Sequence, residues 1–331
     1  MAASTDTEIL PDDAAAVMRA AMLLRQGRLV AFPTETVYGL GGDACSTAAV
    51  AAIFVAKGRP QQNPLIVHLA DLAAARRIAA FDDAALVVAA AFWPGPLTLV
   101  LPLIAGGGIA GAVTAGLGTI AVRVPAHPVA QALLAAFGGP LAAPSANPSG
   151  RVSPTSAAHV TDGLSGRIAA VIDGGICPVG VESTILDLTR PGLPLLLRPG
   201  GTPTEALEAI LGQPLAQRAQ GGTLTAPGQM ASHYAPEAAL RLNVTLPLAG
   251  EVWVGFGPGC GDAATSLSPT GDVAEAAARL FQALHTADAL AGPGGRIAFA
   301  PVPETGLGQA VNDRLRRAAA PRGSQDQGLD G

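Results

Sequence analysis

Two cations lie two positions apart in the segment KGRP (57–60). Lys57 ends an apolar stripe formed by Val50, Ile53 and Phe54, so we expect it at the C-terminus of a helix. A cation there commonly complements the negative end of the helix dipole. Lys57 and Arg59 would nevertheless repel each other unless an anion lies between them, and a triphosphate would satisfy both. The pattern is typical of a helix end and also of a phosphate site.

A polar segment, PTETVYGL (33–40), directly follows an expected strand at 28–32. Its hydroxyls, carboxylate and phenol come from Thr34, Glu35, Thr36 and Tyr38. In open α/β sheets ligands bind near strand ends, so these side chains could hold a small polar ligand. From the residues alone, a plain polar loop is an equally good interpretation.

Two polar residues lie inside apolar strand patterns. His68 belongs to LIVHL (65–69), and Arg123 belongs to IAVRV (120–124). A buried unpaired charge is very costly, so Arg123 needs an anionic partner, either a substrate carboxylate or a structural Asp or Glu. A lone His in such a strand is either a hydrogen-bonded core residue or a ligand-binding group.

Three further segments place hydroxyl, amide or guanidinium donors after expected strands. They are PSAN (144–147) with Ser153 nearby, EST (182–184) and RPG (198–200). Such donors suit phosphate oxygens or ribose. Each segment taken singly is also an ordinary turn signal.

Several familiar nucleotide and metal motifs are missing from the sequence. There is no GxxxxGK[ST] loop, no dinucleotide fingerprint around the glycines at 106–108, no GxSxG elbow, and no HExxH or paired Cys/His cluster. Any nucleotide would therefore be held by scattered Lys, Arg, Ser and Asn side chains. We predict no metal ligands in the protein itself, and Mg²⁺ would be carried mainly by the nucleotide phosphates.

Predicted strands alternate with predicted helices in both halves of the chain, which favours an α/β fold. A length of 331 residues favours two domains. We place a catalytic domain over 1–212 and a small α/β domain with a disordered tail over 237–331. Between them, 213–236 is rich in Gln, Gly, Thr, Pro and Ser, which is typical of a linker. Ser46 and Ser153 are expected N-caps of helices.

Composition argues against several classes of protein. A net charge of −5 disfavours stable direct nucleic-acid binding, which usually requires a basic surface. Cys45, Cys177 and Cys260 are far apart, which fits a reducing compartment. The longest apolar run, 84–93, is too short for a membrane span, and the N-terminus shows no signal-peptide pattern. We therefore expect a cytoplasmic protein.

A series of motifs resembles the threonylcarbamoyl-AMP synthase family, in its long form with a YrdC-type catalytic domain. The motifs are AFPTETVYGLG (31–41), AKGRPQQNPLIVHL (56–69), WPGPLTLVL (93–101), TAGLGTIAVRVPAHP (114–128), APSANPSG (143–150), SPT (153–155), GVEST (180–184) and LLRPG (196–200). They cover most of 15–212 in the family's order. The segment APGQMASHYAP (226–236) is also similar to the long form, whereas the region after 236 resembles the family only loosely.

The resemblance implies a fold and a set of site residues. The fold is a twisted open sheet flanked by helices, followed by a smaller Rossmann-like α/β domain. Lys57 and Arg59 would be catalytic and would bind the ATP phosphates with Ser145 and Asn147. The other ATP-binding residues implied by the family are Thr119, Ser153, Arg198, His233 and Tyr234. The residues implied for L-threonine are Thr34, Tyr38, His68, Arg123 and Ser183.

The resemblance also implies the reaction of a nucleotidyltransferase. L-threonine, bicarbonate and ATP, with Mg²⁺ accompanying the ATP, would give threonylcarbamoyl-AMP and pyrophosphate. A tRNA threonylcarbamoyl-transferase machinery would then use the product. The linker at 213–236 would close over the nucleotide.

The alternatives to this interpretation are one other enzyme and two proteins of a different class. The first is the hydrogenase-maturation carbamoyltransferase, which shares a YrdC-type module but is much longer and rich in Cys. The others are an RNA-binding module and an α/β protein without activity. Pyrophosphate release that requires both threonine and bicarbonate separates the synthase from all three.

Overall fold

Residues 6–217 and 234–321 are described by the structure, a computed structural model. They form two compact units. The first unit holds 6–149 and 153–217, and the second holds 150–152 and 234–321. Much of the expected linker falls outside the described residues, so the domain limits at 212 and 237 stay a prediction.

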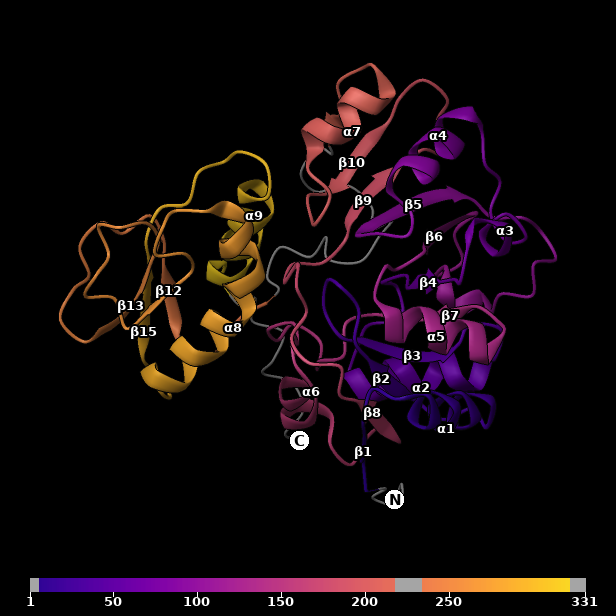
Figure 1. Ribbon diagram of the computed structural model, residues 1–331, viewed down its shortest axis with the longest axis horizontal. Coiled ribbons are helices and arrows are strands. Elements are labelled where there is room, and N and C mark those ends of the chain that lie inside the picture. Colours follow the sequence, from indigo (N-terminus) through magenta and orange to yellow (C-terminus); the bar gives the residue numbers. More distant parts are fainter. Residues whose placement is uncertain (1–5, 218–233, 322–331) are drawn as a thin grey trace, which may run out of the picture. The chain divides into compact units, whose positions relative to one another are not determined.

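A mixed sheet of eleven strands, in the order β1-β8-β2-β3-β7-β4-β6-β5-β9-β10-β11, runs through the described part of the first unit (Figure 1). The strands are β1 (Glu8–Leu10), β2 (Val30–Phe32), β3 (Gly39–Asp43), β4 (Ile66–His68), β5 (Leu97–Pro102), β6 (Thr119–Arg123), β7 (Leu141–Ala142), β8 (Ala170–Ile172), β9 (Thr184–Asp187), β10 (Leu195–Arg198) and β11 (Ala216–Gln217). The sheet contains both parallel and antiparallel pairs; for example, β4 and β6 are parallel, whereas β5 and β6 are antiparallel.

Helices cover this sheet on both faces. They are α1 (Ala14–Arg25), α2 (Thr47–Lys57), α3 (Leu72–Ala75), α4 (Asp83–Phe92), α5 (Pro128–Phe137), α6 (Ala157–Leu164) and α7 (Thr204–Leu211), with the 3-10 turn η1 (Gly111–Val113). Helices α1 and α5 pack together in one apolar cluster, which takes Val30 and Phe32 from β2. Ala31, between them, belongs to the other cluster. Because successive strand residues face opposite sides, both faces of the sheet are buried under helices.

Side-chain caps fix where several helices begin. The Ser46 hydroxyl accepts a hydrogen bond from Ala49 N and caps α2, as predicted, and α2 ends at Gly58 in the left-handed conformation with φ of 60°. The predicted cap at Ser153 is wrong. Ser156 caps α6, because the Ser153 hydroxyl donates instead to the Glu182 carboxylate, at a distance of 2.6 Å.

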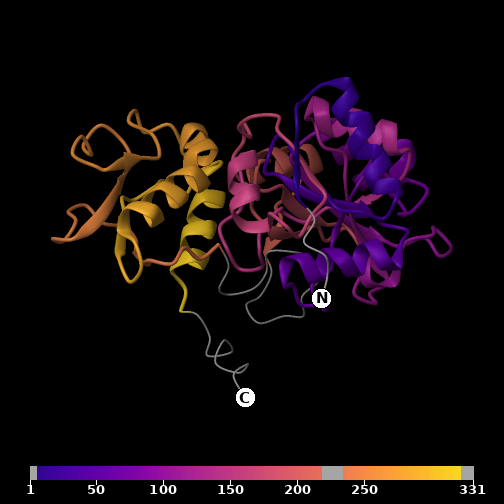
Figure 2. The same ribbon diagram turned by 90° about the horizontal axis from the view of Figure 1, so that it is seen from below.

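The second unit contains a parallel sheet in the order β12-β15-β13-β14. Its strands are β12 (Ala239–Arg241), β13 (Glu251–Gly255), β14 (Thr265–Ser266) and β15 (Arg296–Phe299), and its helices are α8 (Val273–Ala291) and α9 (Gly308–Ala319). The two helices lie side by side, as Figure 2 shows. Helix α8 joins the strands β14 and β15, and this parallel sheet with its two helices confirms the predicted small α/β domain. None of the described helices in either unit is long and apolar enough to cross a membrane.

Candidate active site

Lys57 joins two motifs that lie far apart in the sequence. It ends α2, and its Nζ atom donates hydrogen bonds to the main-chain oxygens of Ser145 and Asn147, at a distance of 2.5 Å in each case. The main-chain oxygen of Lys57 in turn accepts a hydrogen bond from Ser149 N at 2.7 Å. The ammonium therefore holds the loop 145–149 against the end of α2.

Burial controls the charge state of this lysine. Lys57 is buried, and burial lowers the pKa of its ammonium well below the usual range. The positive charge of Arg59 lowers this pKa further. Arg59 is also buried, and its guanidinium donates to the main-chain oxygens of Asn63 and Pro64. Two buried cations in mutual repulsion make a site where an anion would be strongly favoured.

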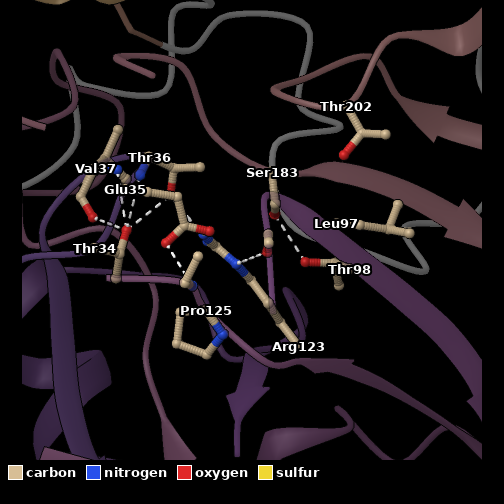
Figure 3. Close-up of polar contacts among 12 residues, drawn as sticks. Thr34, Glu35, Thr36, Val37, Leu97, Thr98, Arg123, Pro125, Ser183 and Thr202 are labelled. Carbon is tan, nitrogen blue, oxygen red and sulfur yellow. Dashed lines mark hydrogen bonds and ion pairs between the residues drawn. The ribbon is translucent and has the colours of Figure 1, made fainter. Parts of the chain in front are cut away.

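A second polar cluster surrounds Arg123 at the end of β6 (Figure 3). Its guanidinium donates to Glu35 Oε1 at 2.6 Å, to Thr36 Oγ1 at 2.9 Å and to the main-chain oxygen of Gly95 at 3.2 Å. Thr34 Oγ1 lies 2.8 Å from Thr36 Oγ1 and also accepts from the main-chain nitrogen of Val37. Glu35 is thus the structural acid that the sequence analysis left open as the partner of Arg123.

Opposing effects set the ionisation of Glu35. Burial raises the pKa of its carboxyl, but the charge and hydrogen bond of Arg123 and a hydrogen bond from Ala126 N outweigh burial. The net result is a pKa below the usual value, so Glu35 is a carboxylate at neutral pH. It balances the charge of Arg123 inside the protein.

His68 lies directly beside Arg123, because β4 and β6 pair in parallel with these two residues in register. Burial, and then the charge of Arg123, lower the pKa of His68 to about 3. The imidazole is therefore neutral at physiological pH. Its Nδ1 atom is buried and has no hydrogen-bond partner among the described residues.

A third group of contacts surrounds Ser183, immediately before β9. Arg198, at the end of β10, donates to the main-chain oxygen of Ser183 from both Nε and Nη2, at 3.1 and 2.9 Å. The neighbouring Glu182 accepts from the Ser153 hydroxyl. Two residues expected at the nucleotide, Ser153 and Arg198, therefore adjoin a residue expected at threonine.

The main chain of the polar loop 33–38 connects these groups. Tyr38 accepts a hydrogen bond from Ala146 N at 2.8 Å and donates one to the oxygen of Pro154 at 2.9 Å. The main-chain oxygen of Glu35 accepts from Val179 N at 2.8 Å. The segment that carries the Arg123 partners thus also binds the loop held by Lys57.

The remaining expected site residues are placed differently. The Tyr38 side chain is fully buried, and its hydroxyl donates to Gly175 O at 2.8 Å; burial raises the pKa of this phenol. Thr119 begins β6 opposite Pro102 and takes part in none of the contacts above. Tyr234 lies in the second unit, with its ring centroid 5.6 Å from that of Phe281. His233 lies outside the described residues.

Comparisons with known proteins identify the family. Residues 22–200 match the Sua5, YciO and YrdC family model, described as "Telomere recombination", and residues 202–320 match the threonylcarbamoyl-AMP synthase C-terminal domain. The chain is 43% identical over 324 residues to a threonylcarbamoyl-AMP synthase of Pyrococcus abyssi, covering 92% of this chain and 94% of that one. The chain belongs to the threonylcarbamoyl-AMP synthase family.

Further family members agree along nearly the whole chain. The Bacillus subtilis threonylcarbamoyl-AMP synthase is 40% identical over 330 residues, covering 92% of this chain and 93% of its own. A crystal structure of P. abyssi Sua5 complexed with L-threonine matches with a TM-score of 0.86 and 40% identity, covering 95% of this chain and 98% of that one. The predicted family and α/β fold are confirmed, including the C-terminal domain for which the sequence resemblance was loose.

Within this family fold, the structure adds side chains that the sequence analysis did not place in the site. Glu35 was noted as part of the polar loop, and its role as the partner of Arg123 was not assigned. Glu182 and Thr98 were not assigned either, although both are buried polar residues beside Ser183. The signal for Glu35 was available, because a buried Arg requires an acid and Glu35 is the acid of the neighbouring polar loop.

Proposed function

We propose that this chain is a threonylcarbamoyl-AMP synthase, which converts L-threonine, bicarbonate and ATP into threonylcarbamoyl-AMP and pyrophosphate. Membership of the family supports this activity. The observation that carries it is the contact of Lys57 with both Ser145 and Asn147. This contact brings the cationic motif KGRP (57–60) next to the donor motif PSAN (144–147). Arg123, Ser183 and neutral His68 supply a second polar cluster in the same unit.

On the nucleotide side, Lys57 and Arg59 would face the ATP phosphates. The other residues proposed here are Thr119, Ser145, Asn147, Ser153, Arg198, His233 and Tyr234. Phosphate charge would offset the mutual repulsion of the two buried cations, which supports this assignment. Mg²⁺ would enter with ATP, held mainly by phosphate oxygens and water. No group of three or more His, Cys, Asp or Glu among the described residues could hold a metal ion by itself.

On the amino-acid side, the proposed residues are Thr34, Tyr38, His68, Arg123 and Ser183. Three of the five guanidinium N–H groups of Arg123 donate to protein acceptors in the described structure, which leaves two for a threonine carboxylate. The unpartnered Nδ1 of His68 supports a ligand beside Arg123. The charges of Glu35 and Arg123 sum to zero, so the pair has no net charge, as zwitterionic threonine has none.

The proposed chemistry has two steps. The neutral amine of threonine first adds to bicarbonate, or to CO₂ derived from it, and water is released as N-carboxythreonine forms. An oxygen of the new carboxylate then attacks the α-phosphorus of ATP, the bond to the β-phosphate oxygen breaks, and pyrophosphate leaves. The enzyme contributes orientation of the two reactants and positive charge beside the developing phosphoryl charge. No covalent enzyme intermediate is required.

Pyrophosphate release from the purified full-length chain tests this function. We expect release only when ATP, L-threonine and bicarbonate are all present, together with threonylcarbamoyl-AMP detectable by mass spectrometry. Pyrophosphate release without threonine would overturn the proposal. Replacement of bicarbonate by carbamoyl phosphate tests the carbamoyltransferase alternative, and we expect it to give no product.

The product implies a partner. A mixed anhydride of a carbamate and AMP is a reactive donor, so a transferase must move its threonylcarbamoyl group to a tRNA adenosine soon after release. The free cysteines Cys45, Cys177 and Cys260 fit a reducing compartment, which supports a cytoplasmic location. Because the net charge is −5, we expect the synthase to bind tRNA weakly by itself, which salt-dependent retention on immobilised RNA would check.

A further inference from the structure

The last two residues of the segment WPGPLT (93–98) begin β5. The segment makes hydrogen bonds with Arg123 and with Thr184 at the start of β9. Gly95 O accepts a hydrogen bond from Arg123 Nε at 3.2 Å, and the next oxygen, of Pro96, accepts from Thr184 N at 2.9 Å. Thr98 follows on β5, with no exposed surface. This short segment therefore lies between Arg123 and the Ser183-Thr184 pair.

Among the described residues, the hydroxyl of Thr98 has one hydrogen-bond partner, Ser183. The two oxygen atoms, Thr98 Oγ1 and Ser183 Oγ, are 2.7 Å apart, and either can be the donor (Figure 3). Arg198 Nη2 also lies 3.3 Å from Ser183 Oγ and can only donate to it. Ser183 Oγ is thus approached by a cationic donor and by a second hydroxyl.

Proton accounting decides which hydroxyl donates. Each hydroxyl has one proton and two lone pairs, so the Thr98–Ser183 contact uses one of the two protons. If Ser183 donated, the Thr98 proton would be left without an acceptor in the interior of β5, at the full cost of desolvation. If Thr98 donates, Ser183 Oγ accepts from both Thr98 and Arg198, and its own proton is available for a ligand. The second arrangement is favoured whenever a ligand offers an acceptor.

We propose that Thr98 is a positioning residue, which directs the hydroxyl proton of Ser183 toward the carboxylate of bound threonine. The inference rests on the proposed function, which places Ser183 at threonine. A carboxylate is the acceptor that fits, because Arg198 donates to Ser183 itself and the same 95–98 segment accepts a hydrogen bond from a second cation, Arg123. Thr98 itself does not touch the substrate and acts only through Ser183.

Two substitutions separate this role from a packing role. Thr98→Val keeps the shape and removes the hydroxyl, and Thr98→Ser keeps the hydroxyl and removes a methyl group. In steady-state pyrophosphate assays of the full-length enzyme, we expect Thr98→Val to raise KM for threonine by about five- to tenfold, the size of one neutral hydrogen bond. KM for ATP should change by less than about twofold, and Thr98→Ser should restore KM for threonine to within about twofold of the unmodified enzyme.

Two further variants serve as benchmark and control. Ser183→Ala should raise KM for threonine at least as much as Thr98→Val, and the double variant should be no worse than Ser183→Ala, because Thr98 acts through Ser183. Thr114→Val removes another buried hydroxyl, one that donates to Gly111 O, and should leave KM for threonine unchanged. Val is well tolerated in a strand, so Thr98→Val should fold, which its unfolding temperature will check.

The outcomes distinguish failure of this inference from failure of the proposed function. If Ser183→Ala raises KM for threonine and Thr98→Val does not, the role of Thr98 is overturned and the site stands. If Ser183→Ala leaves KM for threonine unchanged, the placement of threonine at Ser183 is wrong, and the inference falls with it. If Thr98→Val raises both KM values alike and Thr98→Ser fails to rescue, the residue is structural and the inference is overturned.

Discussion

Arg123 Nη2 lies 2.6 Å from Glu35 Oε1, and the two side chains are only 4% and 9% exposed. The residues are 88 positions apart, so the pair joins the polar loop after β2 to the end of β6. Each partner has further hydrogen bonds, from Ala126 N to Glu35 and from Arg123 to Thr36 and Gly95. A buried ion pair is tolerated when its remaining donors and acceptors are satisfied in this way.

Removal of one charge from this pair should destabilise the first unit. Glu35→Gln keeps the shape and leaves Arg123 as a buried charge without its counterion, so we expect the free energy of unfolding to fall by about 3–5 kcal/mol. Arg123→Met in the same chain removes the orphaned charge, and the double variant should recover much of that loss. Urea unfolding of the four proteins measures the coupling. Strictly additive losses would contradict a direct interaction between the two side chains.

Lys57 is the single lysine of the sequence, beside 19 arginines. Its Nζ fits between the oxygens of Ser145 and Asn147, a position that the longer, planar guanidinium cannot occupy without displacing the loop. We therefore expect Lys57→Arg to lower kcat/KM about as much as Lys57→Met, by about 100-fold or more, with the fold retained. The exposed Arg77→Lys is the matched control and should retain activity. A fully active Lys57→Arg enzyme would show that charge alone is needed at this position.

Because Lys57 is the single lysine of the sequence, the pKa of its ammonium can be measured directly. Selective isotope labelling of lysine should give one side-chain NMR signal, because no other lysine is present. We expect a titration midpoint well below 10.5, since burial and then Arg59 disfavour the charged form. Saturating ATP should raise the midpoint, because phosphate charge favours the ammonium. A midpoint near 10.5 that ATP does not move would contradict a buried site for phosphate.

Stability should depend on pH through His68. Its folded pKa of about 3 lies below the usual 6.5, so between these values the unfolded state binds more protons than the folded state. Stability from this residue is therefore complete above pH 6.5 and is lost as the pH falls. Between pH 7 and pH 5 the loss should be about 2 kcal/mol. His68→Asn should lack this part of the pH dependence, which urea unfolding at the two pH values measures. Equal losses in both proteins would place the imidazole in water.

The strands with ordinary apolar patterns were predictable from the sequence, and β3 was not. Its sequence, GLGGD, has few residues that favour strands. The reason lies in tertiary packing: a Cβ at Gly41 would meet the Phe32 ring at 2.9 Å, so glycine is needed where β2 and β3 pack. The short strands β1, β11, β12 and β14 were also missed, because two or three residues carry no readable period.

In the site, the sequence identified functional residues, and the fold was needed to show which residues they contact. The sequence identified Lys57 and Asn147 as donors, but they are 90 positions apart, and only folding shows that they touch. Ser153 was assigned to a helix cap because a Ser before a helical pattern is a good local signal. Its real partner, Glu182, is 29 positions away. Local patterns therefore identified the polar residues of the site, but they did not predict the partners of those residues.

Gly200, in the LLRPG motif (196–200), should be essential for the geometry at Ser183. A Cβ at this position would lie 2.3 Å from Glu182 O and 2.4 Å from the carbonyl carbon of Ser183, and both are main-chain atoms that cannot rotate away. Gly200→Ala should therefore push Glu182 and Ser183 from their positions, lower the free energy of unfolding by about 1–3 kcal/mol and raise KM for threonine. Gly118→Ala is the matched control, because a Cβ at that exposed position has no atom within 4 Å and should change neither quantity. Thermal unfolding and steady-state kinetics on both variants give the comparison. If Gly200→Ala behaves like Gly118→Ala in both, the close approach of residue 200 to the Ser183 main chain does not set the position of the hydroxyl.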